Sequence, residues 1–156
     1  YRHQRAIDQL VRRSHTSVNP MRLEPVNPES LGAAKGYSNG VLVRGDCDLL
    51  FVAGQIAWDS AQQIVSTQFA AQFEQALKNV ATVIHAAGGE TAHIVRMTIY
   101  VTDKTEYVAA LRDVGAAYRA VIGRHYPAMA LVQVAALLEP GAKVEIEATA
   151  ALPRRA

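Results

Sequence analysis

The chain contains little cysteine: Cys47 is the single one among 156 residues. One thiol cannot form an intrachain disulfide or build a zinc site of several cysteines, so a reducing, cytoplasmic environment is the default expectation. A reactive thiolate needs cationic neighbours, whereas Cys47 stands between Asp46 and Asp48. We therefore do not expect this cysteine to act as a nucleophile.

An excess of basic residues is also missing from most of the chain. The formal net charge is +2, but residues 1–20 hold four arginines against one aspartate, a charge of +3. Residues 21–156 are left with a charge of −1. Nucleic-acid binding relies on clustered Lys and Arg side chains that neutralise phosphates. The composition therefore argues against a nucleic-acid partner.

Long apolar runs are absent as well. No stretch approaches the roughly 18–20 apolar residues of a membrane-spanning helix, and residues 1–20 hold no apolar core of a signal peptide. Half of the residues are hydrophobic and 19% are charged, which suits one globular domain with a sizeable core. We predict a basic leader over residues 1–20, disordered or non-native, and a single domain over residues 21–156.

Hydrophobic periodicity predicts the order of the elements. A stripe of apolar residues at helical spacing predicts a helix over residues 67–87, and a second helix follows Asp103 and ends before Gly123. Runs rich in β-branched residues predict strands over residues 40–45, 49–56, 93–103, 127–137 and 143–152. The first two strands are expected to form a hairpin. The order ββαβαββ predicts an α+β fold with both helices on one face of a mainly antiparallel sheet.

Alternation along the strands predicts what lies on the other face of the sheet. Glu145 and Glu147 of the last strand are expected to point away from the helices. Met129 and Leu131 of the preceding strand are expected to do the same, as is Arg96. A face that mixes apolar and charged side chains in this way favours contact with another subunit.

Six segments of the chain form a recognisable series: GYSNGV (36–41), FVAGQIAWD (51–59), ALKNVATVIHAAGG (76–89), VRMTIYVTD (95–103), YPAMALVQVAAL (126–137) and KVEIEATA (143–150). In order and spacing they resemble the Rid family, the YjgF-like reactive intermediate deaminases that are also called endoribonuclease L-PSP. The resemblance covers about residues 36–152. It implies a chorismate-mutase-like fold and a homotrimer with a cleft between each pair of subunits.

The resemblance also implies roles for individual residues. Deaminating members of the family hydrolyse 2-aminoacrylate and related enamines or imines to 2-keto acids and ammonia. Glu145 matches the glutamate that positions or activates water, and Tyr37, Gly54 and Gln55 match residues that line the cleft. Leu131 is expected to contribute to the wall of the pocket. Neither the residues nor the resemblance indicates a cofactor.

Three positions depart from the family pattern. The arginine that holds the substrate carboxylate with two charged hydrogen bonds is Met129 here, the serine before Gly-Gln is Ala53, and an asparagine of the second helix falls at Gly115. Losing such a charged contact costs on the order of 2–5 kcal/mol. The usual arginine-clamped chemistry on 2-aminoacrylate is therefore not expected. Arg96 is the nearest candidate for a replacement cation.

Three functions remain open at this point. The first is hydrolysis of an imine or enamine metabolite by a homotrimer, with Glu145 positioning water while Met129, Leu131 and Tyr37 shape the pocket. The second is a binding protein without catalysis, which the loss of the arginine and the serine favours. The third is a ribonuclease, ranked last because the domain is not basic. Since His85, His93 and His125 share no metal-ligand spacing, we expect no metal centre.

Overall fold

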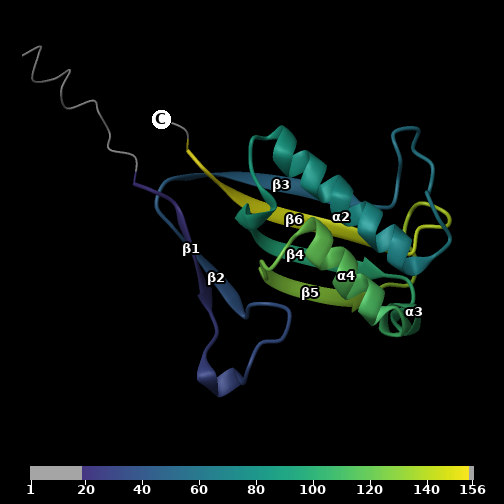
Figure 1. Ribbon diagram of the computed structural model, residues 1–156, viewed down its shortest axis with the longest axis horizontal. Coiled ribbons are helices and arrows are strands. Elements are labelled where there is room, and N and C mark those ends of the chain that lie inside the picture. The colour runs from purple at the N-terminus through teal and green to yellow at the C-terminus, as the bar shows by residue number, and fades with distance from the viewer. Residues whose placement is uncertain (1–18, 155–156) are drawn as a thin grey trace, which may run out of the picture.

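The computed structural model describes residues 19–154 (Figure 1). Almost all of the predicted leader, residues 1–18, therefore lies outside the described residues. The strands are β1 (Arg22–Val26), β2 (Gly40–Arg44), β3 (Cys47–Gln55), β4 (Ile94–Val101), β5 (Ala128–Gln133) and β6 (Val144–Pro153). The helices are α2 (Phe69–Ala86), α3 (Lys104–Ala109) and α4 (Leu111–Val121), with short 3-10 helices η1 (Glu29–Leu31) and η2 (Thr91–His93).

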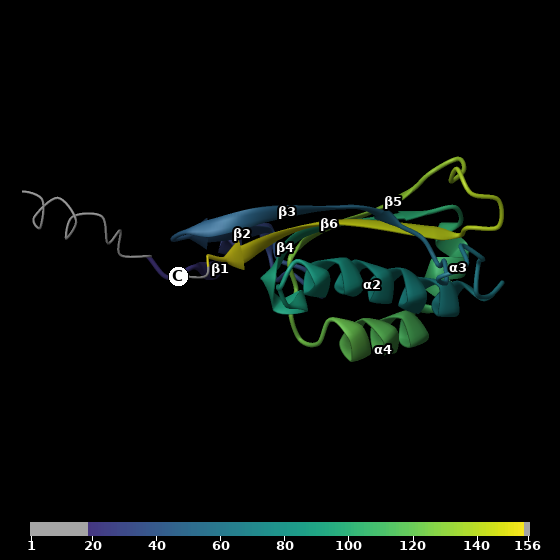
Figure 2. The ribbon, with the colours of Figure 1, turned by 90° about the horizontal axis from the view of Figure 1, so that it is seen from above.

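The main sheet has four strands in the order β3-β6-β4-β5. Strand β6 pairs antiparallel with both β3 and β4, while β4 and β5 run parallel. Helices α2 and α4 lie on the same side of this sheet (Figure 2). The predicted α+β fold, with its helices on one face of a mixed and mainly antiparallel sheet, is confirmed.

Helix α2 holds the core together because its apolar stripe faces the sheet. Phe73, Leu77 and Ile84 are almost fully buried, and they pack in one cluster with Met97 of β4 and Ile146 of β6. Burying each such side chain contributes about 1.5–3 kcal/mol to folding. The predicted helix over residues 67–87 is therefore confirmed to within two residues, with its apolar stripe inward.

One fully buried polar side chain fixes the start of α2 against the sheet. The Gln72 amide nitrogen donates to the carbonyl oxygens of Ser66, at 2.7 Å, and Gly141, at 2.9 Å. Its amide oxygen accepts from the backbone N–H of Lys143 at 2.8 Å. Gln72 thus ties the loop before α2 to the turn before β6.

The predicted hairpin of residues 40–45 with 49–56 is wrong. Strand β2 pairs with β1 in a separate two-stranded sheet, which Figure 1 shows beside the main sheet, whereas β3 pairs with β6. The chain does turn at Gly45, whose φ is 84°. Beyond this turn β3 leaves β2, because its apolar residues Leu50 and Val52 pack over the helices beside β6.

The second predicted helix is present but interrupted. It forms α3 and α4, which meet at Ala110. Asp103 caps α3, since its Oδ1 accepts from the backbone N–H of Thr105 at 2.7 Å. The break turns α4 into a separate element that packs beside α2.

Candidate functional site

Three of the predicted site residues, Glu145, Ala53 and Gly54, lie together on the face of the sheet that points away from the helices. Val144 and Ile146 are fully buried beneath α2, so Glu145 between them points to the outer face. There its carboxylate lies directly over Gly54 of β3. Ala53 and Gly54 are both exposed, and the Gln55 amide donates to the Ala53 carbonyl at 3.1 Å.

The place of the Glu145 carboxylate depends on an irregularity of β3. The register with β6 shifts between Val52 and Gln55, which leaves Ala53 and Gly54 outside the regular pairing. A Cβ atom on Gly54 would collide with the Glu145 carboxylate. The glycine therefore creates the space that this carboxylate occupies.

Met129 and Leu131 lie on the opposite face, so the prediction that they point outward is wrong. Parallel pairing sets Met129 beside Met97 and Leu131 beside Ile99, and neighbours in register share a face. Met97 and Ile99 belong to the core, and Met129 and Leu131 pack against it. Because apolar residues occupy both faces of β5, alternation alone could not decide between them. Val132 is the residue left 42% exposed outside.

Arg96 points to the outer face, as predicted, and so lies on the face opposite Met129 of its own chain. It alternates with the buried Met97, so it points to the outer face, where it lines a recess of about 270 Å³ with Phe51, Thr98 and Glu147. Met129 lies on the other side of the sheet. Within one chain, Arg96 therefore cannot replace a cation beside Met129.

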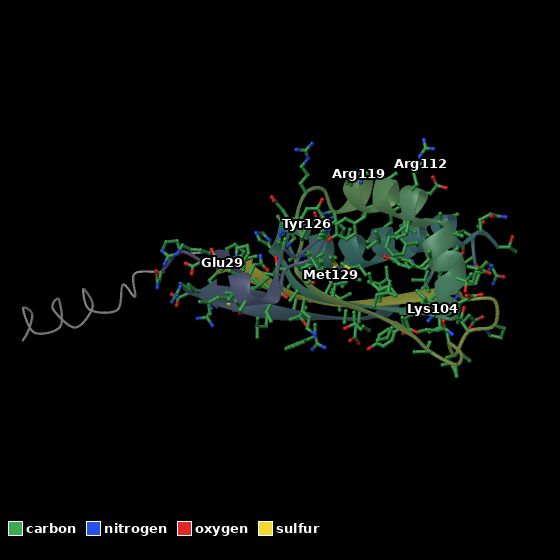
Figure 3. The ribbon with its side chains drawn as sticks, turned by 90° about the horizontal axis from the view of Figure 1, so that it is seen from below. Glu29, Lys104, Arg112, Arg119, Tyr126 and Met129 are labelled. Carbon is green, nitrogen blue, oxygen red and sulfur yellow. The ribbon has the colours of Figure 1, made fainter. Side chains whose placement is uncertain are left out.

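Met129 lines a pocket between α4 and the edge strand β5. The cavity has a volume of about 240 Å³, and its walls include Ile99, Gly115, Tyr118, Arg119, Tyr126 and Met129. Figure 3 shows Met129 on the helix side of the sheet and Arg119 on α4. The Gly115 position, inferred only from the resemblance, thus does lie in the same pocket as Met129.

The pocket has a rigid aromatic side. The rings of Tyr118 and Tyr126 stack with their centroids 5.9 Å apart, and the Tyr118 hydroxyl donates to the His125 carbonyl at 2.8 Å. Burial raises the pKa of the Tyr118 phenol far above its ordinary value, so this donor stays protonated. Sequence reasoning did not select Tyr118, Tyr126 or Arg119, because their shared pocket depends on where α4 lies relative to β5 once it packs against α2.

Tyr37 lies close to this pocket, and its neighbours explain why. The backbone N–H of Ser38 donates to the Pro127 carbonyl at 3.0 Å, and the Ser38 hydroxyl donates to the Tyr126 carbonyl at 2.7 Å. These bonds hold the chain against the start of β5. Tyr37 is 42% exposed there, and the preceding Gly36 lines the pocket itself.

Five of the predicted site residues therefore form two groups on opposite faces of the sheet. Glu145, Ala53 and Gly54 belong to the outer group, and Met129 and Leu131 belong to the group on the helix side. Gln55 pairs with the buried Ile146, and Tyr37 belongs to the segment held against the start of β5. Among residues 19–154, no cluster of His, Cys, Asp and Glu could hold a metal ion. Over the same range, no helix is long and apolar enough to cross a membrane.

Comparison with known proteins identifies the family. The sequence model of the endoribonuclease L-PSP family matches residues 28–152. The chain belongs to this family, known also as Rid or YjgF. A Rid-family protein of unknown function from Yersinia pestis, YyfB, has the same fold, with a TM-score of 0.70 and 32% identity over 83% of this chain and 98% of its own. The YjgF gene product of E. coli matches with a TM-score of 0.58 and 33% identity, over 85% and 99% of the two chains.

Two curated relatives of the Rid family extend this comparison. The RutC family protein y4sK of Sinorhizobium fredii is 36% identical over 132 residues, which cover 83% of this chain and 98% of the relative. The human 2-iminobutanoate/2-iminopropanoate deaminase is 36% identical over 120 residues, covering 76% of this chain and 82% of the enzyme. The similarity therefore extends over most of the length of both relatives.

Proposed function

We propose that this Rid-family chain forms a homotrimer that hydrolyses an imine or enamine metabolite in a cleft between subunits. Glu145 of one subunit positions the attacking water, and the pocket at Met129 of its neighbour holds the substrate. The observation that carries this proposal is the place of the Glu145 carboxylate, on the outer face over Gly54. The deaminase activity named for the human relative supports the reaction class.

The outer face suits contact with another subunit. Leu49 is 57% exposed and Phe51 is 74% exposed, both on the same side of the sheet as Glu145. Val132 on β5 adds a third exposed apolar side chain to this face. Apolar side chains gathered on one face commonly mark a protein interface. If a second subunit covers this face, the edge of that subunit's sheet comes close to Glu145.

The reaction needs one group that can move a proton. The Glu145 carboxylate accepts a proton from water while the water oxygen adds to the C=N carbon, which gives a carbinolamine. That first proton passes to the nitrogen and completes the carbinolamine. Glu145 then takes the proton of the carbinolamine hydroxyl and delivers it to the nitrogen as the C–N bond breaks, so the products are ammonia and a carbonyl compound. The hydrolysis consumes one water molecule and changes no oxidation state. Because Met129 carries no charge, the substrate is not held by the usual arginine of β5.

The test compares two neighbouring carboxylates on one strand. Glu145→Gln keeps the shape of the side chain but removes the proton acceptor, so turnover of 2-iminobutanoate generated in situ should fall by about 10²–10⁴-fold. Glu147→Gln is the matched control, since Glu147 shares the face but accepts a hydrogen bond from the Tyr100 hydroxyl at 3.0 Å. Glu147→Gln should stay active. Full activity in Glu145→Gln would refute the proposed role.

A binding protein without catalysis is the second candidate. The observation that favours it is the apolar pocket at Met129, together with Ala53 at the serine position. In that case the wild type binds small molecules but hydrolyses no imine, and Glu145→Gln leaves binding unchanged. Ribonuclease activity ranks third, because the charge of residues 21–156 is −1.

A further inference from the structure

We propose that a second pocket, between the small β1–β2 sheet (Figure 1) and the segment that leads into β5, binds a small molecule with a phosphate monoester and a flat ring. The cavity has a volume of about 450 Å³, and neither Glu145 nor Met129 lines it. The proposal is therefore independent of the proposed function.

The lining of this pocket gathers basic side chains, although residues 21–156 carry a net charge of −1. They come from β1, from η2 and from the segment between α4 and β5, and they are Arg22, His93, Arg124 and His125. No aspartate or glutamate occurs among the described residues that line the pocket. A cavity lined by one sign of charge concentrates ligands of the opposite sign. The pocket therefore favours an anion.

The two guanidinium groups have donors available to a ligand. Within residues 19–154, no carboxylate pairs with Arg124, which is exposed at the rim of the pocket. Arg22 has one long contact, 3.6 Å from its Nε to Oε1 of Glu24, because the Glu24 carboxylate binds Arg44 at 2.8 Å. A guanidinium presents parallel N–H donors that match the oxygens of a phosphate group.

Each of the two imidazole rings is fixed through one nitrogen. Nδ1 of His93 accepts from the backbone N–H of Glu90 at 3.0 Å, so the neutral ring carries its proton on Nε2. This second nitrogen has no partner among the described residues and is left for a ligand. Nε2 of His125 donates to the Ile94 carbonyl at 2.6 Å, which holds that ring in the wall of the pocket. His93 thus adds a further donor to the two guanidinium groups.

This set of donors suits a phosphate monoester better than a single carboxylate. A phosphate monoester carries a charge of about −1.5 to −2 at pH 7 and has three terminal oxygens that accept hydrogen bonds. Tyr37 and Tyr126 add two aromatic rings to the lining, against which a flat ring can stack. A volume of about 450 Å³ is enough for one ring with its phosphate group.

The experiment measures the binding of two isosteric probes, phenyl phosphate and phenyl sulfate, by calorimetry on the full-length wild type. In slightly alkaline buffer the phosphate carries two negative charges and the sulfate one, so phenyl phosphate should bind at least about tenfold more tightly. Added salt should weaken its binding, because Arg22 and Arg124 are exposed. Arg124→Gln should weaken phenyl phosphate by roughly ten- to a hundredfold. Arg22→Gln should cause a smaller loss, because Glu24 already attracts this guanidinium.

Arg119→Gln is the matched control, since Arg119 lines the pocket at Met129 but not this one. It should bind phenyl phosphate like the wild type. Failure of phenyl phosphate to bind, equal affinity for phenyl sulfate, or unchanged binding in Arg124→Gln would each overturn the proposal. An equal loss in Arg119→Gln would also overturn it, because the effect would then be general electrostatics.

Two further probes test the ring and the source of the phosphate. Glycerol 3-phosphate, which has no ring, should bind more weakly than phenyl phosphate, and equal affinity would overturn the assignment of a flat body. Vesicles of phosphatidylcholine, with or without phosphatidic acid, should not sediment the protein, because the proposed ligand is a free small molecule. Sedimentation that needs phosphatidic acid and is lost in Arg124→Gln would overturn that choice in favour of a lipid headgroup.

Discussion

Met129 and Glu145 point to opposite faces of the same four-stranded sheet. Met129 packs toward the helices beside Met97, whereas Glu145 lies outside over Gly54. One chain therefore cannot bring these two side chains to a common ligand. If both serve one cleft, as we propose, each cleft takes Glu145 from one subunit and the pocket from the next.

Mixing two inactive variants tests whether Glu145 and the pocket of one cleft come from different subunits. Glu145→Gln removes the proton acceptor, and Gly115→Leu fills the pocket of the same chain. Each variant alone should be inactive, but co-refolded mixtures should regain roughly a quarter of the wild-type activity, because random assembly rebuilds some complete clefts. Activity is measured on the co-refolded assembly, with the separately refolded variants mixed afterwards as control. No recovery in the co-refolded sample would contradict a shared cleft.

Gly54 should be intolerant of even a methyl group. Gly54→Ala places its Cβ where the Glu145 carboxylate lies, and the flexible end of that side chain has to move away. We expect turnover to fall about tenfold to a hundredfold while the thermal unfolding midpoint changes little. Gly40→Ala is the control, since its Cβ would meet Val26 at an ordinary 3.6 Å. Equal activity of both variants would contradict the assigned place of Glu145.

Met129→Arg tests whether methionine at the family's arginine position in β5 limits the deamination of 2-aminoacrylate. The variant should deaminate 2-aminoacrylate generated in situ at least about tenfold faster than the wild type, because a charged fork again faces the carboxylate. A coupled assay for the keto acid measures both proteins. A variant no faster than the wild type would show that the missing charge at position 129 does not limit the reaction.

Gln72 should be essential for stability. Gln72→Leu removes hydrogen bonds to Ser66, Gly141 and Lys143 and leaves buried backbone groups without partners. We expect the free energy of unfolding to fall by about 2–4 kcal/mol, measured by urea titration. Gln68→Leu is the control, because Gln68 is exposed and its side chain makes no capping hydrogen bond. A loss below about 1 kcal/mol would contradict this account.

The sequence predicts the elements that have one apolar face better than those that have two. The stripe on α2 has a single apolar side, so its extent and its inward face followed from periodicity. Strand β5 offers apolar residues on both sides, and only its pairing with β4 assigns Met129 inward. The hairpin failed for a related reason, since local turn chemistry at Gly45 does not determine which distant strand β3 joins.

The same limit applies to the candidate site. Glu145 was found by resemblance together with strand alternation, and both depend on local sequence. Gly115 and Arg119 stand one helical turn apart on α4, but they share a pocket with Met129 only because α4 packs against α2 on the helix side of β5. Sites assembled from two elements through packing are therefore the part that sequence reasoning missed.

The contact between Gly54 and the Glu145 carboxylate also restricts how this chain can evolve. A larger residue at position 54 displaces the Glu145 carboxylate from its place, so glutamate at position 145 keeps its position only where residue 54 is glycine. Among relatives of this chain, these two positions, 91 residues apart in the sequence, should therefore change together rather than independently.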